Sequence, residues 1–214
     1  MSQTESQQPT IELRRAKYQR AHAEHAAVIL LVAVFVIVAV TAAGGLQAAS
    51  QAAGKETLPG VVNYTRVDAN VAVGGALSLE AIPELKRRGF KAVINLRRPT
   101  EPNANVEAEG EAVRAAGLKY INLPFSAAEP YDVAAGQVAP FLKALAEPSN
   151  LPVLIHSAQS HRPVGMLVIK RVVVEGWSLD KAFAADDAQV LSDGSAGAKG
   201  IQQFVRSYIT AHPR

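Results

Sequence analysis

One short stretch of the chain brings together residue types that can hold an anion. Residues 156–162 read His-Ser-Ala-Gln-Ser-His-Arg, after the apolar run 153–155 and before Pro163, Val164 and Gly165. The apolar run predicts a buried strand, and the apolar residues after Pro163 predict a buried helix with the proline in its first turn. A loop between a strand end and a helix N-terminus points backbone N–H groups at one spot, where the helix dipole adds positive potential. The stretch therefore predicts an anion-binding loop.

The side chains of this loop fit the same chemistry. Arg162 offers a planar fork of donors that can grip an oxyanion at two points. A serine hydroxyl such as that of Ser157 becomes a useful nucleophile only beside a base. His156 and His161 are near in sequence, but a histidine next to an anion-binding arginine is badly placed to stay neutral. The residues that we expect to hold a phosphate-type anion are Ser157, Ala158, Gln159, Ser160, His161 and Arg162.

Such a loop needs a scaffold that sets a strand end against a helix start, and the chain after residue 60 supplies it. The pattern predicts strands at residues 71–73, 90–96, 120–123 and 153–156. Helical spacing or capping signals mark residues 78–88, 106–116, 138–145, 163–175, 178–190 and 199–210. Alternating strands and helices with short connections predict an α/β fold: a mostly parallel sheet with helices on both faces. Ligands of such sheets bind outside the carboxyl ends of the strands, where residues 156–162 lie.

Composition removes several kinds of chemistry. The chain has 214 residues and no cysteine, which excludes disulfides, zinc–thiolate sites and thiolate catalysis. Its net charge of +3 comes without a basic stripe interleaved with aromatic residues, so we expect no nucleic-acid partner. The five histidines show no spacing typical of metal ligands, and neither a metal nor a cofactor is expected.

An uncharged apolar segment precedes the α/β region. Residues 26–46 are long enough to cross a bilayer as a helix, and basic residues are concentrated before them. We expect residues 1–25 in the cytoplasm, a transmembrane helix at 26–46, a linker at 47–60, and the folded domain, residues 61–214, outside the cytoplasm. The alternative is a cleaved signal peptide, with a small-residue cleavage site near Ser50.

The loop resembles the signature of the cysteine-dependent tyrosine and dual-specificity phosphatases: His-Cys, a few loop residues, Arg, then Ser/Thr-Gly. The resemblance covers residues 63–190. Within the family, the chain is similar to small bacterial members, which include the branch related to the β-lactamase-hydrolase-like proteins. Besides the loop it rests on Gly74-Gly75, Phe90-Lys91-Ala92-Val93-Ile94-Asn95-Leu96-Arg97, Gly117-Leu118-Lys119-Tyr120, Pro152–His156 and Glu175-Gly176-Trp177-Ser178. It implies a phosphatase-type fold and a phosphorylated or otherwise anionic ligand.

Three positions depart from the family pattern. Ser157 stands where the family has its nucleophilic cysteine, and Ser160 where it usually has glycine. Four residues separate Ser157 from Arg162, whereas counting back from Gly165 puts the family's arginine at Pro163. The resemblance also implies a general acid, for which Asp132 is the first candidate and Glu129 the second.

These departures leave three hypotheses about function. The first is a membrane-anchored tyrosine or dual-specificity phosphatase-like protein, a weak or inactive pseudophosphatase that binds a phosphate-type anion or a protein partner. The second is an active phosphomonoesterase with an unusual serine or histidine nucleophile. The third is a degenerate rhodanese-like module, in which the shorter spacing to the arginine is also found.

Overall fold

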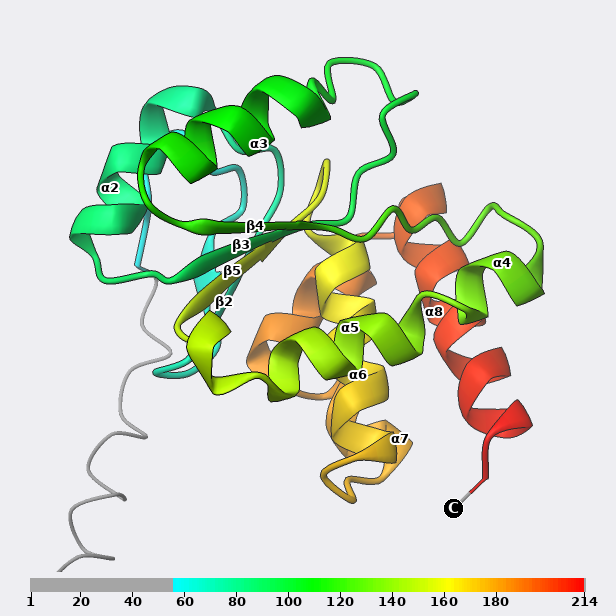
Figure 1. Ribbon diagram of the computed structural model, residues 1–214. Helices are drawn as coiled ribbons and strands as arrows, with labels where there is room; N and C mark the ends of the chain where they lie inside the picture. The colour runs from blue at the N-terminus through cyan, green and yellow to red at the C-terminus, as the bar shows by residue number, and fades with distance from the viewer. Residues whose placement is uncertain (1–55, 214) are drawn as a thin grey trace, which may run out of the picture. The chain divides into compact units, whose positions relative to one another are not determined.

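The computed structural model describes residues 56–213, and its centre is one five-stranded sheet (Figure 1). The strand order is β1-β2-β5-β3-β4. The strands are β1 (Thr65–Arg66), β2 (Val71–Gly74), β3 (Ala92–Asn95), β4 (Lys119–Asn122) and β5 (Val153–His156). Parallel pairing joins β2 to β5, β5 to β3 and β3 to β4, and only β1 runs antiparallel. The predicted α/β fold with a mostly parallel sheet is confirmed.

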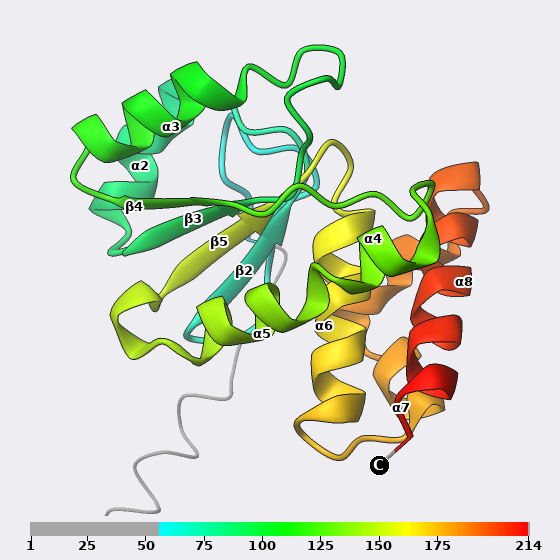
Figure 2. The same cartoon turned by 45° about the vertical axis from the view of Figure 1, so that its right-hand side comes forward.

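Helices cover both faces of the sheet (Figures 1 and 2). One face carries α2 (Ile82–Arg87) and α3 (Val106–Ala115). The other carries α5 (Val138–Ala146), α6 (His161–Val173), α7 (Leu179–Phe183) and α8 (Ala196–Ala211), with the short α4 (Tyr131–Ala135) beside them. Three 3₁₀ segments complete the pattern: η2 (Leu79–Ala81), η3 (Pro148–Asn150) and η4 (Asp186–Ser192).

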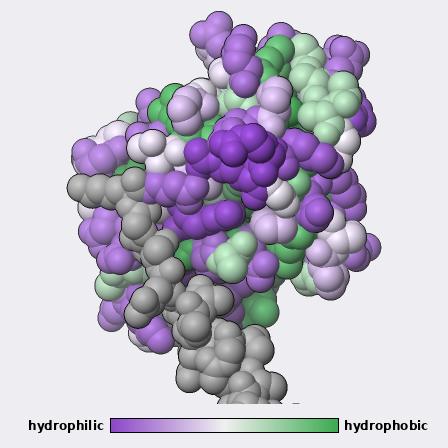
Figure 3. Space-filling model, turned by 90° about the vertical axis from the view of Figure 1, so that its left-hand side faces the viewer, coloured by the Kyte–Doolittle hydropathy of each residue, from purple (hydrophilic) through white to green (hydrophobic). Residues whose placement is uncertain are grey.

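The strand sequences explain why the central strands are buried on both sides. All four residues of β3, and all four of β5, are buried, as expected of parallel strands between two helical layers. Alternate side chains of β5 enter opposite cores: Leu154 packs in the α2–α3 core, and Ile155 in the core of α5, α6 and α8. The outer surface around α2 is hydrophilic (Figure 3), and there Glu84 pairs with Arg87 and Arg88.

Several predicted boundaries hold. Pro163 lies in the first turn of α6, as expected, and Ser178 caps α7, because its hydroxyl accepts a hydrogen bond from the Lys181 N–H. The single helix predicted at 178–190 is wrong. Ala185 is extended and separates α7 from η4, and Asp187 turns inward to form an ion pair with the buried Arg171. The strand β1 and the helix α4 had no clear sequence signal, since both are very short.

The predicted transmembrane helix at 26–46 and the cytoplasmic segment at 1–25 lie outside the described residues. Within residues 56–213, no helix has the length and apolar character that a bilayer-spanning helix needs.

Candidate anion-binding site

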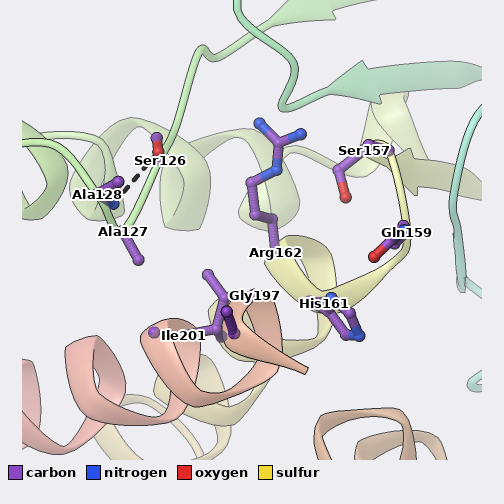
Figure 4. Close-up of a pocket in the computed structure, with 12 residues that line it drawn as sticks. Ser126, Ala127, Ala128, Ser157, Gln159, His161, Arg162, Gly197 and Ile201 are labelled. Atoms are coloured by element: carbon purple, nitrogen blue, oxygen red, sulfur yellow. Dashed lines mark hydrogen bonds between the residues drawn. The ribbon is translucent and has the colours of Figure 1, made fainter. Parts of the chain in front are cut away.

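The loop after β5 lies at the carboxyl edge of the sheet, as predicted. Register places His156 beside Gly74 of β2 and Asn95 of β3, so three strands end together below the loop. A cavity of about 300 Å³ opens there (Figure 4). Its lining comes from the loop, from the segment after β4 and from the start of α8: Ser126, Ala127, Ala128, Ser157, Ala158, Gln159, His161, Arg162, Ala196, Gly197, Gly200 and Ile201.

The loop backbone offers hydrogen-bond donors to this cavity. The Ser157 N–H donates to the carbonyl of Gly74 and is therefore in use. Among the described residues, the N–H groups of Ala158, Gln159 and His161 donate to no acceptor, and all three residues line the cavity. Unsatisfied amides beside the N-terminus of α6, a helix of 13 residues, are an arrangement that favours an anion.

Ser160 takes the backbone conformation that a glycine would supply. Its φ of +64° lies in the left-handed region, and its side chain is almost fully buried. The hydroxyl donates to the carbonyl of Gln159 at 2.5 Å. Non-glycine residues adopt this conformation at a cost of about 1–2 kcal/mol. The tight turn of the loop is thus retained despite the serine, and the loop is strained at this residue.

Arg162 is held by three segments rather than left free for a ligand. Its Nη1 lies 2.9 Å from the carbonyl oxygen of Leu96, just after β3, and 2.9 Å from that of Phe125, just after β4. The carboxylate of Glu101 accepts from Nη1 at 2.6 Å and from Nη2 at 2.7 Å. The bidentate fork that we expected to grip an anion therefore grips a carboxylate of the chain itself.

Glu101 is ionised throughout the ordinary pH range. Burial opposes its charge, but the hydrogen bonds from Arg162 and from the Arg98 N–H outweigh burial and lower the pKa of Glu101 to about 2. Its neighbour Arg97 is buried and donates to the carbonyls of Pro102 and Asn103. Nε of Arg97 and Nε of Arg98 each lie 3.6 Å from the Glu101 carboxylate. The loop between β3 and α3 thus gathers three arginines at one carboxylate, and Arg162 makes the bidentate contact.

His161 contacts a carboxylate at the edge of the cavity. Its Nε2 lies 2.7 Å from Oδ2 of Asp193, and its ring packs against Gly197. Hydrogen bonds to Ser195, followed by the contact with His161, lower the pKa of Asp193 to about 2. His161 therefore faces a charged carboxylate, in the same cavity as Ser157.

Below the loop, His156 belongs to a buried polar network on the α3 side of the sheet. Its Nε2 lies 2.8 Å from Oε1 of Glu109, and the same oxygen accepts from the Asn95 amide at 2.9 Å. That amide also donates to the hydroxyl of Tyr120, at 2.9 Å. Glu109 and His156 are almost completely buried, and Nδ1 of His156 has no partner among residues 56–213. The network joins α3, β3, β4 and β5 directly under Ser157.

Neither candidate general acid lines the cavity. Asp132 is exposed in the first turn of α4, and Glu129 forms an ion pair with Arg98 at 2.7 Å. The residues that this segment turns toward the cavity are Ser126, Ala127 and Ala128. Asp132 stays a prediction as a catalytic residue, and the structure places it away from the other predicted site residues.

A mostly parallel sheet, with a loop that leads from the carboxyl end of β5 into α6, is the arrangement expected of tyrosine and dual-specificity phosphatase-like proteins. The chain belongs to the family described as DSP-PTPase phosphatase fused to NAD+ kinase, whose model matches residues 53–206. A comparison with curated proteins found no match.

Solved structures share the fold at low sequence identity. A DUF442 protein from Shewanella putrefaciens CN-32 has 18% identity and a TM-score of 0.60, covering 77% of this chain and all of that one. The core catalytic domain of the PP-IP phosphatase Siw14 from Saccharomyces cerevisiae, in complex with citrate, has 21% identity and a TM-score of 0.55, covering 71% of this chain and 88% of its own. TpbA from Pseudomonas aeruginosa, with serine replacing a cysteine and in complex with phosphotyrosine, has 19% identity and a TM-score of 0.51, covering 71% of this chain and 91% of its own.

Sequence reasoning missed three carboxylates of the site: Glu101, Glu109 and Asp193. Each meets its partner far along the chain, as with the 61 positions between Glu101 and Arg162. The sequence holds one weak signal for these carboxylates. Glu109 interrupts the inward face of a helix, where a carboxylate needs a buried polar partner.

Proposed function

We propose that this protein is a membrane-anchored pseudophosphatase, which binds a phosphate-type anion or a phosphorylated partner in the loop cavity and hydrolyses it weakly or not at all. The observation that carries the proposal is the composition of the cavity. Ser157 is the residue that follows β5, and the segment after β4 contributes Ser126, Ala127 and Ala128. A phosphoryl transfer to Ser157 would have a weak nucleophile and no acid from that segment to protonate the leaving oxygen.

Anion binding has separate support. The free N–H groups of Ala158, Gln159 and His161 do not depend on the identity of residue 157. Serine is close to cysteine in size, so the loop keeps its shape with either residue. The phosphotyrosine complex of the serine variant of TpbA is consistent with such a loop binding without a thiol. The family match favours this phosphatase-like proposal over a degenerate rhodanese-like module.

Two measurements test the proposal together. Millimolar sulfate or phosphate should raise the melting temperature of the protein by mass action, while hydrolysis of an aryl phosphate stays at background. Ser157→Cys should also stay near background, since Glu101 holds Arg162 and none of the described residues that line the cavity is an aspartate or glutamate. A Ser157→Ala variant should show the same sulfate effect as the wild-type chain. Absence of any anion effect would refute the binding role.

A second candidate is an active phosphomonoesterase with a serine or histidine nucleophile. The observation in its favour is the His161–Asp193 pair, which places an imidazole beside Ser157 in one cavity. Clear wild-type turnover that Ser157→Ala or His161→Gln abolishes would support this candidate and exclude the pseudophosphatase.

Anchoring is the other part of the proposal, and it rests on the uncharged segment 26–46 and the basic residues before it. A reporter that is active only outside the cytoplasm, fused after Arg214, should give signal. The full-length protein should stay in the membrane fraction after carbonate washing. A soluble product that begins near residue 53 would instead identify a cleaved signal peptide.

A further inference from the structure

We propose that Glu101 sets the anion affinity of the loop, because its carboxylate occupies the guanidinium of Arg162 in the place of a ligand. The inference deepens the proposed function and rests on it, since it concerns the same cavity. Glu101 becomes a specificity-determining residue: with it in place, a ligand is held mainly by backbone N–H groups rather than by the arginine.

The hydrogen bonds of Arg162 show how complete this occupation is. Nη1 is shared among the carbonyls of Leu96 and Phe125 and the carboxylate of Glu101. Nη2 has a single partner within residues 56–213, and that partner is Oε2 of Glu101. Both terminal nitrogens of the fork, Nη1 and Nη2, therefore already hold a carboxylate.

Burial makes this contact strong. The side chains of Glu101 and Arg162 are each only 13% exposed, so water screens their attraction weakly. Nε of Arg97 and Nε of Arg98 each lie 3.6 Å from the Glu101 carboxylate, but the side-chain hydrogen bonds of these arginines go elsewhere. Arg97 donates to backbone carbonyls and Arg98 to Glu129. The low pKa of Glu101, about 2, agrees with a carboxylate that stays charged against Arg162.

The consequence for a ligand is electrostatic. An incoming phosphate or sulfate dianion meets a fixed negative charge on the same two nitrogens that would bind it, and the charge of Arg162 is already balanced. The dianion can still use the N–H groups of Ala158, Gln159 and His161. We therefore expect weak binding of free dianions to the wild-type loop and much tighter binding once Glu101 is neutral.

Because the chain has no cysteine, a single introduced thiol can report the electrostatic potential in the loop without any ligand. Ser157→Cys introduces the only thiol in the chain, directly in the loop. Its pKa, measured from the pH dependence of iodoacetamide alkylation, reports the local potential. Adding Glu101→Gln should lower this thiol pKa by about 1, because an opposite charge nearby favours the thiolate and Arg162 is no longer balanced.

Glu129→Gln is the matched control. This variant also removes one negative charge near the cavity. The Glu129 carboxylate, however, pairs with Arg98 and not with Arg162. The variant should leave the thiol pKa nearly unchanged. The sulfate titrations use chains that keep Ser157. By calorimetry, Glu101→Gln should bind sulfate at least about ten-fold more tightly than the wild-type chain, whereas Glu129→Gln should bind it as the wild-type chain does.

The outcomes separate the two proposals. Equal thiol pKa values with and without Glu101→Gln, or equal sulfate affinities, would overturn the role of Glu101 while leaving anion binding intact. A lower thiol pKa with no sulfate binding by any variant would show that Glu101 balances the charge of Arg162, but it would refute the proposed anion-binding function and with it the role of Glu101 in affinity. If Glu101→Gln fails to melt cooperatively, the neutral variant Glu101→Met replaces it, with the same decrease of the thiol pKa expected and no decrease counting against the inference.

Discussion

Replacing Arg162 by alanine should lower the free energy of unfolding by about 3–5 kcal/mol, the usual loss when one partner of a buried ion pair is removed. The variant leaves the carboxylate of Glu101 nearly buried without its bidentate donor. It also leaves the carbonyls of Leu96 and Phe125 without the Nη1 donor that ties two strand ends to α6. Urea-induced unfolding followed by far-UV circular dichroism measures the difference.

A double variant shows whether the loss comes from the unpaired charge. Arg162→Met with Glu101→Leu removes both charges and fills a similar volume, so it should regain most of the stability that Arg162→Ala loses. A loss below about 1 kcal/mol for Arg162→Ala, as for an exposed ion pair, would contradict the structural role. The expected loss also means that Arg162→Ala is a poor test of ligand binding, for which Glu101→Gln is better suited.

Replacing Glu109 by alanine should destabilise the domain by a similar amount, about 3 kcal/mol or more. The carboxylate holds Nε2 of His156 and the amide of Asn95, and all three side chains are almost fully buried. Alanine would leave the imidazole without this carboxylate partner and the Asn95 amide with only the Tyr120 hydroxyl as an acceptor, and it would open a cavity under α3. The melting temperature and the urea midpoint both report this change.

The hydroxyl of Tyr120 supplies the control for the Glu109 network. Tyr120→Phe removes the acceptor of one hydrogen bond from Asn95 and a donor to the carbonyl of Val106, but leaves the Glu109–His156 contact in place. Its loss should be about 1 kcal/mol. If Tyr120→Phe and Glu109→Ala prove equally destabilising, the contact between Glu109 and His156 is not what holds this part of the sheet together.

The fold could be predicted because its signals are local. The apolar run of β5, the proline at the start of α6 and the glycines that end α2 and α3 each act through neighbouring residues. The position of the loop followed from the rule that parallel strands present their carboxyl ends at one edge. Of the six consecutive residues predicted to hold an anion, all except Ser160 line the cavity, and their role in binding stays a prediction.

The partners of those residues could not be predicted, because they depend on tertiary contacts. Nothing in the sequence around Glu101 distinguishes it from a solvated loop residue, yet it completes the coordination of Arg162. Asp132, chosen by its position in the chain, lies on an exposed turn of α4 and does not line the cavity, so its role as a general acid stays a prediction. A carboxylate's function is set by the direction of its side chain, which spacing along the sequence does not encode.

The close contact of α6 with α8 at Gly165 determines which wall of the cavity can move to change the cavity's width. A Cβ at this residue would lie 2.2 Å from Cγ2 of Ile201, so α6 and α8 are in direct contact there. The wall formed by α8 is consequently fixed to the helix that begins at the loop. The opposite wall, Ala127 and Ala128, belongs to an irregular segment (Figure 4). A broader ligand would therefore have to displace this one segment. Insertions in the segment would change selectivity for ligand size without disturbing the loop at residues 157–162.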